Sequence, residues 1–299
     1  MRNRKSRKVF IARFSIFSNT FLIIIKVVAG ILSGSVSIIS EAIHSGMDLM
    51  AAVIAFFSVR VSSNPPDDKH PYGHGKFENI SGVIEAILIL IAAGLIIYEA
   101  IHKLLVPQPI ESHAIGITVM GVSAIVNIIV SRLLYKTAKA TDSVALEADA
   151  LHLKTDVYTS LGVGLGIGLM WITGFYWLDP VVALLVALLI IYESFMLLKK
   201  AYSPLLDTTL SDEELAVINE SINSRLPEGL RFHQLRSRRS GNYKYVDLHL
   251  EVPPETSVLA SHKLCDEIEK EISLRIPDIE VHIHIEPLPD QEKLTGQNV

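Results

Sequence analysis

Cysteine is nearly absent from this chain, which has one, Cys265, among 299 residues. A single thiol excludes an intramolecular disulfide framework and a CxxC metal or redox site, and it suits a reducing compartment. An excess of positive charge is also absent, because the formal net charge is -5 and the charges are spread along the chain. Nucleic-acid binding therefore has no compositional support. The HExxH motif of metalloproteases does not occur, which argues against an intramembrane protease.

Charge is scarce from Phe10 to Leu198 and dense from Lys199 onward, and the mean hydropathy is +0.38. A mean this high over so long a chain is unusual for a soluble protein. The change in composition predicts three parts: a transmembrane domain over residues 1–206, a water-soluble domain over residues 207–290, and a flexible tail over residues 291–299.

Long apolar runs predict transmembrane helices, since a helix needs about 20 mainly apolar residues to cross the hydrocarbon core. Six stretches reach this length: roughly Val9 to Leu32, Val36 to Val61, Ile80 to His102, Ala114 to Tyr135, Ser143 to Ile172 and Leu178 to Leu198. Lys and Arg gather in the N-terminal tail and after the second, fourth and sixth stretches, whereas the opposite loops have none around Ser33 to Ser35, Pro107 to Glu111 and Thr173 to Trp177. This asymmetry predicts that both termini are cytoplasmic.

The remainder of the chain predicts a small α/β domain. Ser211 can cap a helix that runs to about Leu226, and a second helix is expected from about Ser257 to Ile276. Strands are expected over Leu230 to Ser237, Tyr245 to Leu250 and Glu280 to Glu286, with a hairpin turn at Ser240-Gly241-Asn242. The predicted order is αββαβ, a small open sheet covered by two helices.

Two polar pairs in the apolar half share one spacing. His44 and Asp48 lie in the second stretch, and His152 and Asp156 lie in the fifth. Each pair is four residues apart and therefore shares a helical face. If the faces meet, two imidazole nitrogens and two carboxylates converge, which suits tetrahedral Zn²⁺ better than Mn²⁺, an ion that prefers oxygen ligands. The alternative is that each pair is only a polar contact within or between helices.

Other polar residues occur near these pairs. Glu41 and Asp149 each precede one of the histidines by one turn and are expected either to line water-filled approaches or to be helix-end charges in water. Glu85 and Asn127 also fall within apolar stretches. For these two, hydrogen bonding within the helix bundle is the expected role.

The loop after the second stretch contains Asp67, His70 and His74, which could form a second metal site on the cytoplasmic side. The same loop has two prolines and two glycines, so an ordinary hydrophilic loop is the alternative. No feature of the sequence decides between the two interpretations.

Histidines are also frequent in the water-soluble half, at His233, His249, His262, His282 and His284. His282 and His284 alternate along one predicted strand and share a face, and His249 lies in another strand. A histidine cluster across the sheet is therefore expected, with an exposed polar edge strand as the alternative.

Taken together, these motifs resemble a known family. The resemblance rests on SVSII before His44-Ser-Gly-Met-Asp48, on DDKHPYGHGK at residues 67–76, on ADALHLKTD at residues 148–156, on LDP at residues 178–180 and on HIHIEP at residues 282–287. Over roughly residues 8 to 290 the chain is similar to the cation diffusion facilitators, most of all to the compact bacterial zinc/iron efflux type.

The resemblance implies a homodimeric divalent-metal/proton antiporter of the bacterial cytoplasmic (inner) membrane, and not an enzyme. It implies six transmembrane helices and a metal-sensing cytoplasmic domain of ferredoxin-like, metallochaperone-like shape. The implied transport site is His44, Asp48, His152 and Asp156, the loop site is Asp67, His70 and His74, and the cytoplasmic site is His233, His249, His262, His284 and Glu286, with His282 as an extra candidate. Lys76 and Asp207 match a charged pair that interlocks the two protomers.

Exchange for protons is expected on energetic grounds. Expelling a divalent cation from a cell that is negative inside costs about 4.6 kcal/mol per 100 mV, and one inward proton returns about half of this. His44 and His152 are the candidate proton carriers, because a histidine must lose its proton to bind metal.

Several alternatives remain open at this point. The sites could belong to a metal-responsive receptor or scaffold without transport, or to a passive channel or importer. Two histidines in the transport site favour Zn²⁺ over Cd²⁺, but Fe²⁺, Cd²⁺, Co²⁺ and Mn²⁺ remain candidate cations. Metal in the cytoplasmic domain is expected to tighten the dimer and favour transport.

Overall fold

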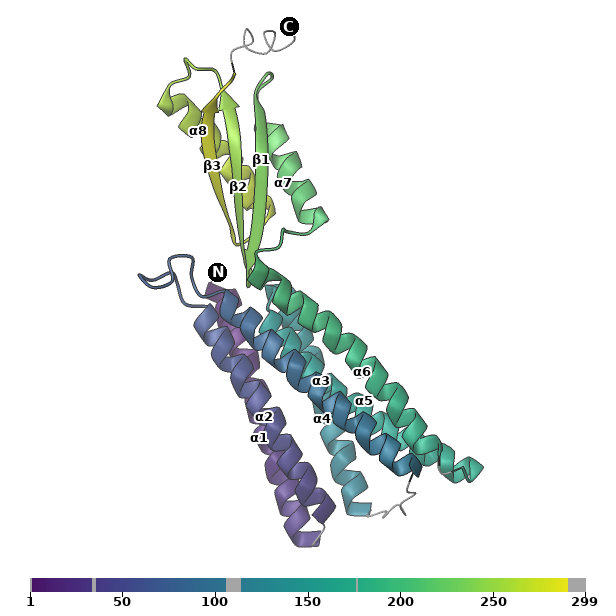
Figure 1. Cartoon of the computed structure of the whole chain (residues 1–299). Coiled ribbons are helices and arrows are strands. Elements are labelled where there is room, and N and C mark those ends of the chain that lie inside the picture. The colour runs from purple at the N-terminus through teal and green to yellow at the C-terminus, as the bar shows by residue number, and fades with distance from the viewer. Residues whose placement is uncertain (1, 34–35, 106–113, 176, 290–299) are drawn as a thin grey trace. The chain divides into compact units, whose positions relative to one another are not determined.

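The chain folds into two compact units, Met1–Ser203 and Pro204–Val299. We call them the helical unit and the sheet unit. The computed structural model describes residues 2–33, 36–105, 114–175 and 177–289 (Figure 1). The tail expected over residues 291–299 lies outside the described residues.

The helical unit contains six long helices, and each covers one of the six predicted apolar stretches. They are α1 (Arg2–Ser33), α2 (Val36–Ser62), α3 (Lys76–Leu105), α4 (Ala114–Thr141), α5 (Val144–Thr173) and α6 (Leu178–Tyr202). Most of these helices extend beyond their apolar stretch into neighbouring polar residues, so the end of a helix is not the end of its apolar run. Among the described residues, three segments are long and apolar enough to cross a membrane: Ser6–Leu32, Lys76–Leu105 and Pro180–Leu206.

Helix packing in this unit relies on small side chains. Figure 1 shows α1 beside α2 and α3 beside α6, and α5 packs against α2, α3, α4 and α6. Ala12, Ala52 and Ala55 are fully buried, whereas Phe10 and Phe17 are more than half exposed. Small residues let helices approach closely where lipid removes the hydrophobic driving force between them.

The sheet unit has the predicted αββαβ order. After a short 3₁₀ helix, η1 (Ser203–Leu206), come α7 (Asp212–Arg225), β1 (Arg231–Ser240), β2 (Tyr243–Val252), α8 (Val258–Arg275) and β3 (Ile279–Pro287). β2 pairs antiparallel with β1 and parallel with β3, so the strand order is β1-β2-β3. The parallel pair requires a crossover, which α8 supplies. Gly241 makes the hairpin turn with a positive φ of 59°, in the left-handed region.

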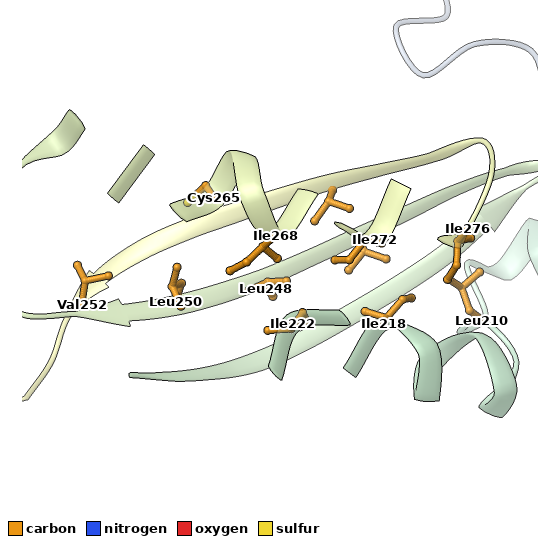
Figure 2. Close-up of a cluster of buried hydrophobic side chains, with 12 residues drawn as sticks. Leu210, Ile218, Ile222, Leu248, Leu250, Val252, Cys265, Ile268, Ile272 and Ile276 are labelled. Carbon is orange, nitrogen blue, oxygen red and sulfur yellow. The ribbon is translucent and has the colours of Figure 1, made fainter. Parts of the chain in front are cut away.

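The core of the sheet unit lies between one face of the sheet and both helices. Figure 2 shows Leu248 and Leu250 of β2 among isoleucines from α7 and α8, such as Ile222 and Ile268. All four side chains are at most 1% exposed. Because residues alternate along a strand, His249 points to the opposite face of the sheet. That face carries the polar residues described below.

Candidate metal centres

Three polar side chains converge between α2 and α5. Asp48 comes from α2, whereas His152 and Asp156 come from α5, where a spacing of four residues places them on one face. One ligand atom of each lies within 4.8 Å of the others. His152 Nε2 lies 3.1 Å from Asp48 Oδ1, and the two side chains are only 13% and 8% exposed. We call these residues the α2–α5 cluster.

The α2–α5 cluster contains three of the four residues predicted for the transport site. The fourth, His44, lies one turn before Asp48 in α2, but its side chain is outside the described residues. Asn127 of α4 donates a hydrogen bond to Asp156 Oδ2 at 3.4 Å. A buried nitrogen with two carboxylates is a donor set that a borderline divalent cation such as Zn²⁺ accepts.

Two further carboxyl groups are fully buried in the helical unit. Glu85 of α3 and Asp149 of α5 are both 0% exposed. Ser81 donates a hydrogen bond to Glu85 Oε1 at 3.0 Å, in line with the expected role of Glu85 inside the bundle. Asp149 does not face solvent in this structure, although it is one of the two residues expected at water-filled approaches. The side chain of the other, Glu41, lies outside the described residues.

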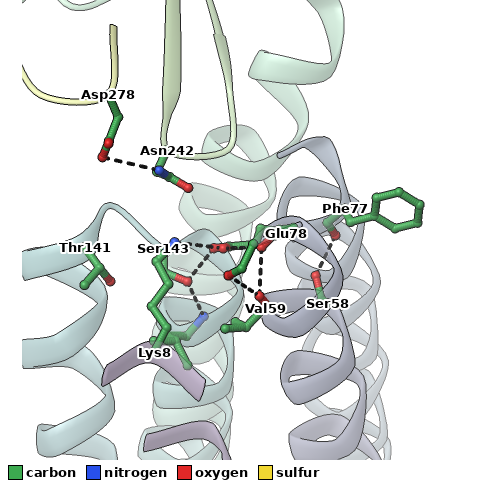
Figure 3. A network of polar contacts seen from close by, with 12 residues as sticks. Lys8, Ser58, Val59, Phe77, Glu78, Thr141, Ser143, Asn242 and Asp278 are labelled. Carbon is green, nitrogen blue, oxygen red and sulfur yellow. Dashed lines mark hydrogen bonds and ion pairs between the residues drawn. The ribbon is translucent and has the colours of Figure 1, made fainter. Parts of the chain in front are cut away.

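A third buried carboxylate, Glu78, is not among the residues that the sequence predicts to be functional. It lies in the first turn of α3 and is 0% exposed. Figure 3 shows it between Lys8 and Ser143: Lys8 Nζ lies 2.9 Å from Oε1, and the Ser143 hydroxyl donates to Oε2. Ser62 donates to Oε1 at 2.7 Å. Glu78 therefore joins α1, α2, α3 and the residue before α5, a link that no local sequence pattern indicates.

The loop between α2 and α3 brings its three predicted residues together. Asp67 Oδ1 lies 3.2 Å from His70 Nδ1, and Asp67 Oδ2 lies 3.3 Å from His74 Nε2. The two imidazole rings are 4.4 Å apart between centroids. His74 is buried, whereas Asp67 and His70 are exposed. This loop cluster can offer three ligand atoms within 4.8 Å of one another.

Backbone contacts hold Asp67 in place. Its Oδ1 accepts hydrogen bonds from the backbone N–H groups of His70, at 2.7 Å, and Lys69, at 3.0 Å. The first of these is the main reason that the pKa of Asp67 lies below its usual range. The ionised carboxylate thus stabilises the loop at neutral pH, and this contribution is lost as the pH falls through the lowered pKa.

Three strands place histidines in one row across the uncovered face of the sheet. His233 of β1 pairs with His249 of β2, which pairs with His284 of β3. The His249 ring is 5.3 Å from that of His233 and 4.9 Å from that of His284 between centroids. Glu286 lies next to this row, with Oε1 2.8 Å from His249 Nδ1 and Oε2 3.3 Å from His233 Nε2.

Among the described residues, His233, His249 and Glu286 meet within 4.8 Å. We call them the sheet cluster. A β-bulge between His233 and Arg236 accompanies a positive φ of 51° at Gln234. A β-bulge changes the direction in which neighbouring side chains point, and this one follows His233 directly along β1.

Three predicted histidines lie outside the sheet cluster. His284 Nε2 is 3.7 Å from Glu286 Oε1 and mostly exposed. His262 lies on α8, 3.6 Å from Asp266, with 68% of its side chain exposed. His282 Nε2 lies 3.2 Å from Glu280 on its own strand. Within one chain, the structure therefore brings together only part of the predicted cytoplasmic site. These three histidines lie beside the sheet cluster or away from it.

Sequence reasoning missed Glu251 beside the sheet cluster. Its Oε1 lies 3.4 Å from His233 Nδ1. Glu251 follows His249 by two residues and so shares its strand face, a signal that could have identified it. Glu251 also pairs with Glu286 in the parallel register, which adds a second carboxylate to this side of the sheet.

The two residues of the predicted charge interlock lie in different units. Lys76 begins α3 in the helical unit, and Asp207 follows η1 in the sheet unit. Asp207 has a positive φ of 52° and lies 3.7 Å from Arg238 within its own unit.

Comparisons with known proteins cover nearly the whole chain. A family model for the cation efflux transmembrane domain matches residues 12–206, and one for the cytoplasmic domain of cation efflux proteins matches residues 210–288. An uncharacterized transporter of Synechocystis sp. is 36% identical over 266 residues, which is 89% of this chain and 86% of that protein. The cation-efflux pump FieF of Escherichia coli is 32% identical over 268 residues, 90% of this chain and 89% of the pump.

Solved structures are similar to part of the chain, and they include a metal-bound domain. The metal-bound C-terminal domain of the CzcD transporter from Thermotoga maritima is 32% identical. It covers 27% of this chain and 99% of that one, with a TM-score of 0.24.

Proposed function

Because the chain belongs to the cation diffusion facilitator family of cation-efflux transporters, we propose that it exports Zn²⁺ from the cytoplasm in exchange for protons. Membership makes it a membrane transporter of divalent cations and not an enzyme. The observation that carries the proposal is the α2–α5 cluster, in which two acids and a histidine from separate helices meet inside the bundle.

The burial of the α2–α5 cluster supports a role in transport. Two carboxylates that are removed from water without a compensating charge are costly, and a divalent cation between them removes that cost. His44 is the proposed fourth ligand, because it precedes Asp48 by four residues on the same helix. Two nitrogens and two oxygens favour Zn²⁺, with Fe²⁺, Cd²⁺, Co²⁺ and Mn²⁺ as lesser candidates.

The contact between His152 and Asp48 suggests how protons enter the exchange. A hydrogen bond between Nε2 and Oδ1 at 3.1 Å requires a proton on one of these atoms. Zn²⁺ needs both atoms free of protons. When His152 is the imidazolium held by Asp48, metal binding releases one proton and metal departure allows it to return, whereas a neutral imidazole only moves its N–H to Nδ1. His44 and His152 are thus the proposed proton carriers at the ligands.

The proposed topology places all six helices of the helical unit across a bacterial cytoplasmic membrane, with both termini inside. The three spans found by length and apolarity and the matched transmembrane domain support this arrangement. The absence of Lys and Arg from residues 33–35, 107–111 and 173–177 supports the orientation. We infer alternating access of the α2–α5 cluster to the two sides.

The loop cluster and the sheet cluster are proposed as accessory metal sites. The sheet cluster is half exposed and faces away from the core, so it can equilibrate with cytoplasmic metal. We propose that metal there tightens a homodimer and favours transport, with His262, His284 and His282 as further candidate ligands. Lys76 and Asp207 are the proposed charge interlock between protomers, and the matched cytoplasmic domain of the family supports dimerisation.

Zinc uptake into inside-out membrane vesicles, with and without an imposed pH gradient, tests the proposal. We expect uptake that accelerates when the lumen is acidic, because protons leaving the lumen then drive zinc inward. Uptake unaffected by the gradient would indicate a passive channel, and binding without uptake would indicate a receptor or scaffold. Either outcome would contradict antiport.

A further inference from the structure

The buried carboxyl groups of the helical unit differ in how far neighbouring groups compensate their charge. Glu78 and Glu85 lie two turns apart on α3, and both are 0% exposed. Glu78 is compensated by the Lys8 ammonium and by hydroxyl donors. In the part of the chain that the structure describes, Glu85 receives one hydrogen bond, from Ser81, and its Oε2 is buried without a partner.

Asp149 is even less compensated than Glu85. It is 0% exposed, and neither carboxyl oxygen has a hydrogen-bond partner among the described residues. Ser15 of α1 turns its own buried hydroxyl toward Asp149 and acts on it as a hydrogen-bond donor, although the contact does not meet strict hydrogen-bond geometry. One weak hydroxyl contact does not compensate a carboxylate that is removed from water.

The charged groups around the pair compensate it only in part. Asp149 is the charged group that acts most strongly on Glu85, and Asp48 adds a further like charge on Asp149. His152 is the titratable group of opposite sign that acts on both. Two ionised carboxylates that repel each other away from water are strongly disfavoured unless they are paired with a cation or neutralised. A proton is the cation that needs no additional ligands and no cavity.

We propose that Glu85 and Asp149 form a proton-binding site separate from the metal ligands. This inference rests on the proposed antiport and assigns part of its proton transfer to groups outside the ligand set. Because neither Asp149 oxygen hydrogen bonds to a candidate ligand, metal and proton do not compete for the same atom here. The two sites communicate through charge: a divalent cation beside Asp48 and His152 disfavours a proton on the neighbouring carboxyl pair.

The exchange then balances as follows. When Zn²⁺ enters from the cytoplasm, the O–H bond of a carboxylic acid in the pair breaks, and its proton leaves to water on that side. The carboxylate charge that remains is balanced by the nearby cation. When Zn²⁺ leaves on the opposite side, the carboxylate binds a proton from that side, and the pair returns to its neutral form.

The test uses the full chain in proteoliposomes, with zinc flux and proton flux recorded in the same vesicles. We expect Glu85→Gln and Asp149→Asn to transport zinc with fewer protons per zinc and with a shallower dependence on pH than the unaltered protein. Glu99→Gln is the matched control, because Glu99 lies on α3 as well but is 70% exposed and beside Lys103. It should leave both properties unchanged.

Each result separates this inference from the proposed function. If the unaltered protein shows no zinc-driven proton flux, antiport itself is wrong. If the unaltered protein exchanges zinc for protons and both variants keep the same ratio and the same pH profile, the carboxyl pair is not a proton site. Zinc titration of the purified variants, compared with Asp156→Ala, which lacks a ligand of the α2–α5 cluster, checks that this cluster still binds metal in the folded variants.

A spectroscopic measurement on the unaltered protein covers the case in which a variant does not fold. Infrared difference spectra recorded on zinc addition should show loss of the carbonyl band of a protonated carboxylic acid. The band should be weaker in whichever of the two single variants folds, and unchanged in Glu99→Gln. Its absence from the unaltered protein would overturn the proposal.

Discussion

The two units of this protein bury different kinds of side chain. Among the described residues, the fully buried apolar positions of the helical unit are mainly alanines, such as Ala12, Ala86 and Ala187. In the sheet unit the core consists of isoleucine, leucine and valine with one cysteine, and no alanine belongs to it. Water drives large aliphatic side chains inward, whereas lipid is itself apolar and leaves close packing of small residues as the main source of stability.

The candidate metal sites differ in the same way. Side chains of the α2–α5 cluster such as Asp48 and His152 are almost completely buried, at 8% and 13% exposure. In the sheet cluster, His233, His249 and Glu286 are 37%, 29% and 34% exposed. The buried set would need a conformational change to exchange a bound cation, while the sheet cluster, which is about one third exposed, would not. This contrast fits one site that transports and another that senses.

The largest expected effect tests that contrast directly. Asp156→Ala should reduce zinc-driven proton flux in proteoliposomes to the level of empty liposomes, because it removes a ligand from the buried cluster. The parallel variant His249→Ala should lower flux only in part, because it weakens metal binding to the sheet unit and leaves the α2–α5 cluster intact. Normal flux from Asp156→Ala, or none from His249→Ala, would reverse the roles given to the two clusters.

The next largest effect concerns the core of the sheet unit. Ile268→Ala should destabilise this unit by about 2–5 kcal/mol, since Ile268 is fully buried and the truncation leaves a cavity. Leu274→Ala, on the same helix but 74% exposed, is the control and should cost little. Hydrogen exchange within residues 204–289 of the full chain measures both. Equal protection in the two variants would show that the large aliphatic core does not stabilise the unit.

A smaller effect is expected at a close approach between helices in the helical unit. A Cβ at Gly82 would lie 2.8 Å from Val144 Cγ1 and 3.0 Å from Ala201 Cβ. Gly82→Ala should therefore destabilise the unit by about 1–3 kcal/mol through overpacking. On the same helix, Gly94 has no atom within 4 Å of that position, so Gly94→Ala should be neutral or stabilising. Thermal unfolding in detergent distinguishes the two variants. A lower unfolding temperature for Gly94→Ala than for Gly82→Ala would refute close packing at Gly82.

The smallest predicted effect is at the start of the sheet unit. Ser211 caps α7: its hydroxyl accepts from the Glu214 N–H, and Glu214 in turn accepts from the Ser211 N–H. Ser211→Ala should cost about 1 kcal/mol, and Ser211→Asp should restore most of it because aspartate is a good cap. Hydrogen exchange of the first turn of α7 measures the change. Identical exchange in Ser211→Ala would mean that the capping box contributes nothing.

Much of the architecture could be predicted because it depends on local pattern. The apolar runs identified all six helices, and the Ser211 cap and the Gly241 turn marked the αββαβ elements near their observed ends. The i,i+4 spacing placed His152 and Asp156 on one face because helical geometry fixes that relation. The histidine row across the sheet was expected only in outline, since strand register depends on long-range pairing.

Long-range contacts account for what was missed. Glu78 and Glu85 lie on the same helix, yet Glu78 contacts Lys8 of α1 and Ser143 just before α5, whereas Glu85 lacks such partners among the described residues. Likewise, His262 is a histidine like any other in the sequence, but α8 holds it away from the sheet cluster of its own chain. Neither difference in partners can be predicted from the periodicity of the sequence.

The sequence by itself determined that this chain is a membrane protein with a charged C-terminal domain, and it placed the candidate metal ligands, because hydropathy and helical spacing act over a few turns. Only the tertiary structure decided which polar groups meet. It set Asp48 of α2 against His152 of α5, paired Glu78 with Lys8, and left Glu85 and Asp149 buried together. Those outcomes depend on which helices pack against each other, and the charge of a buried group is set by its neighbours rather than by its own place in the chain.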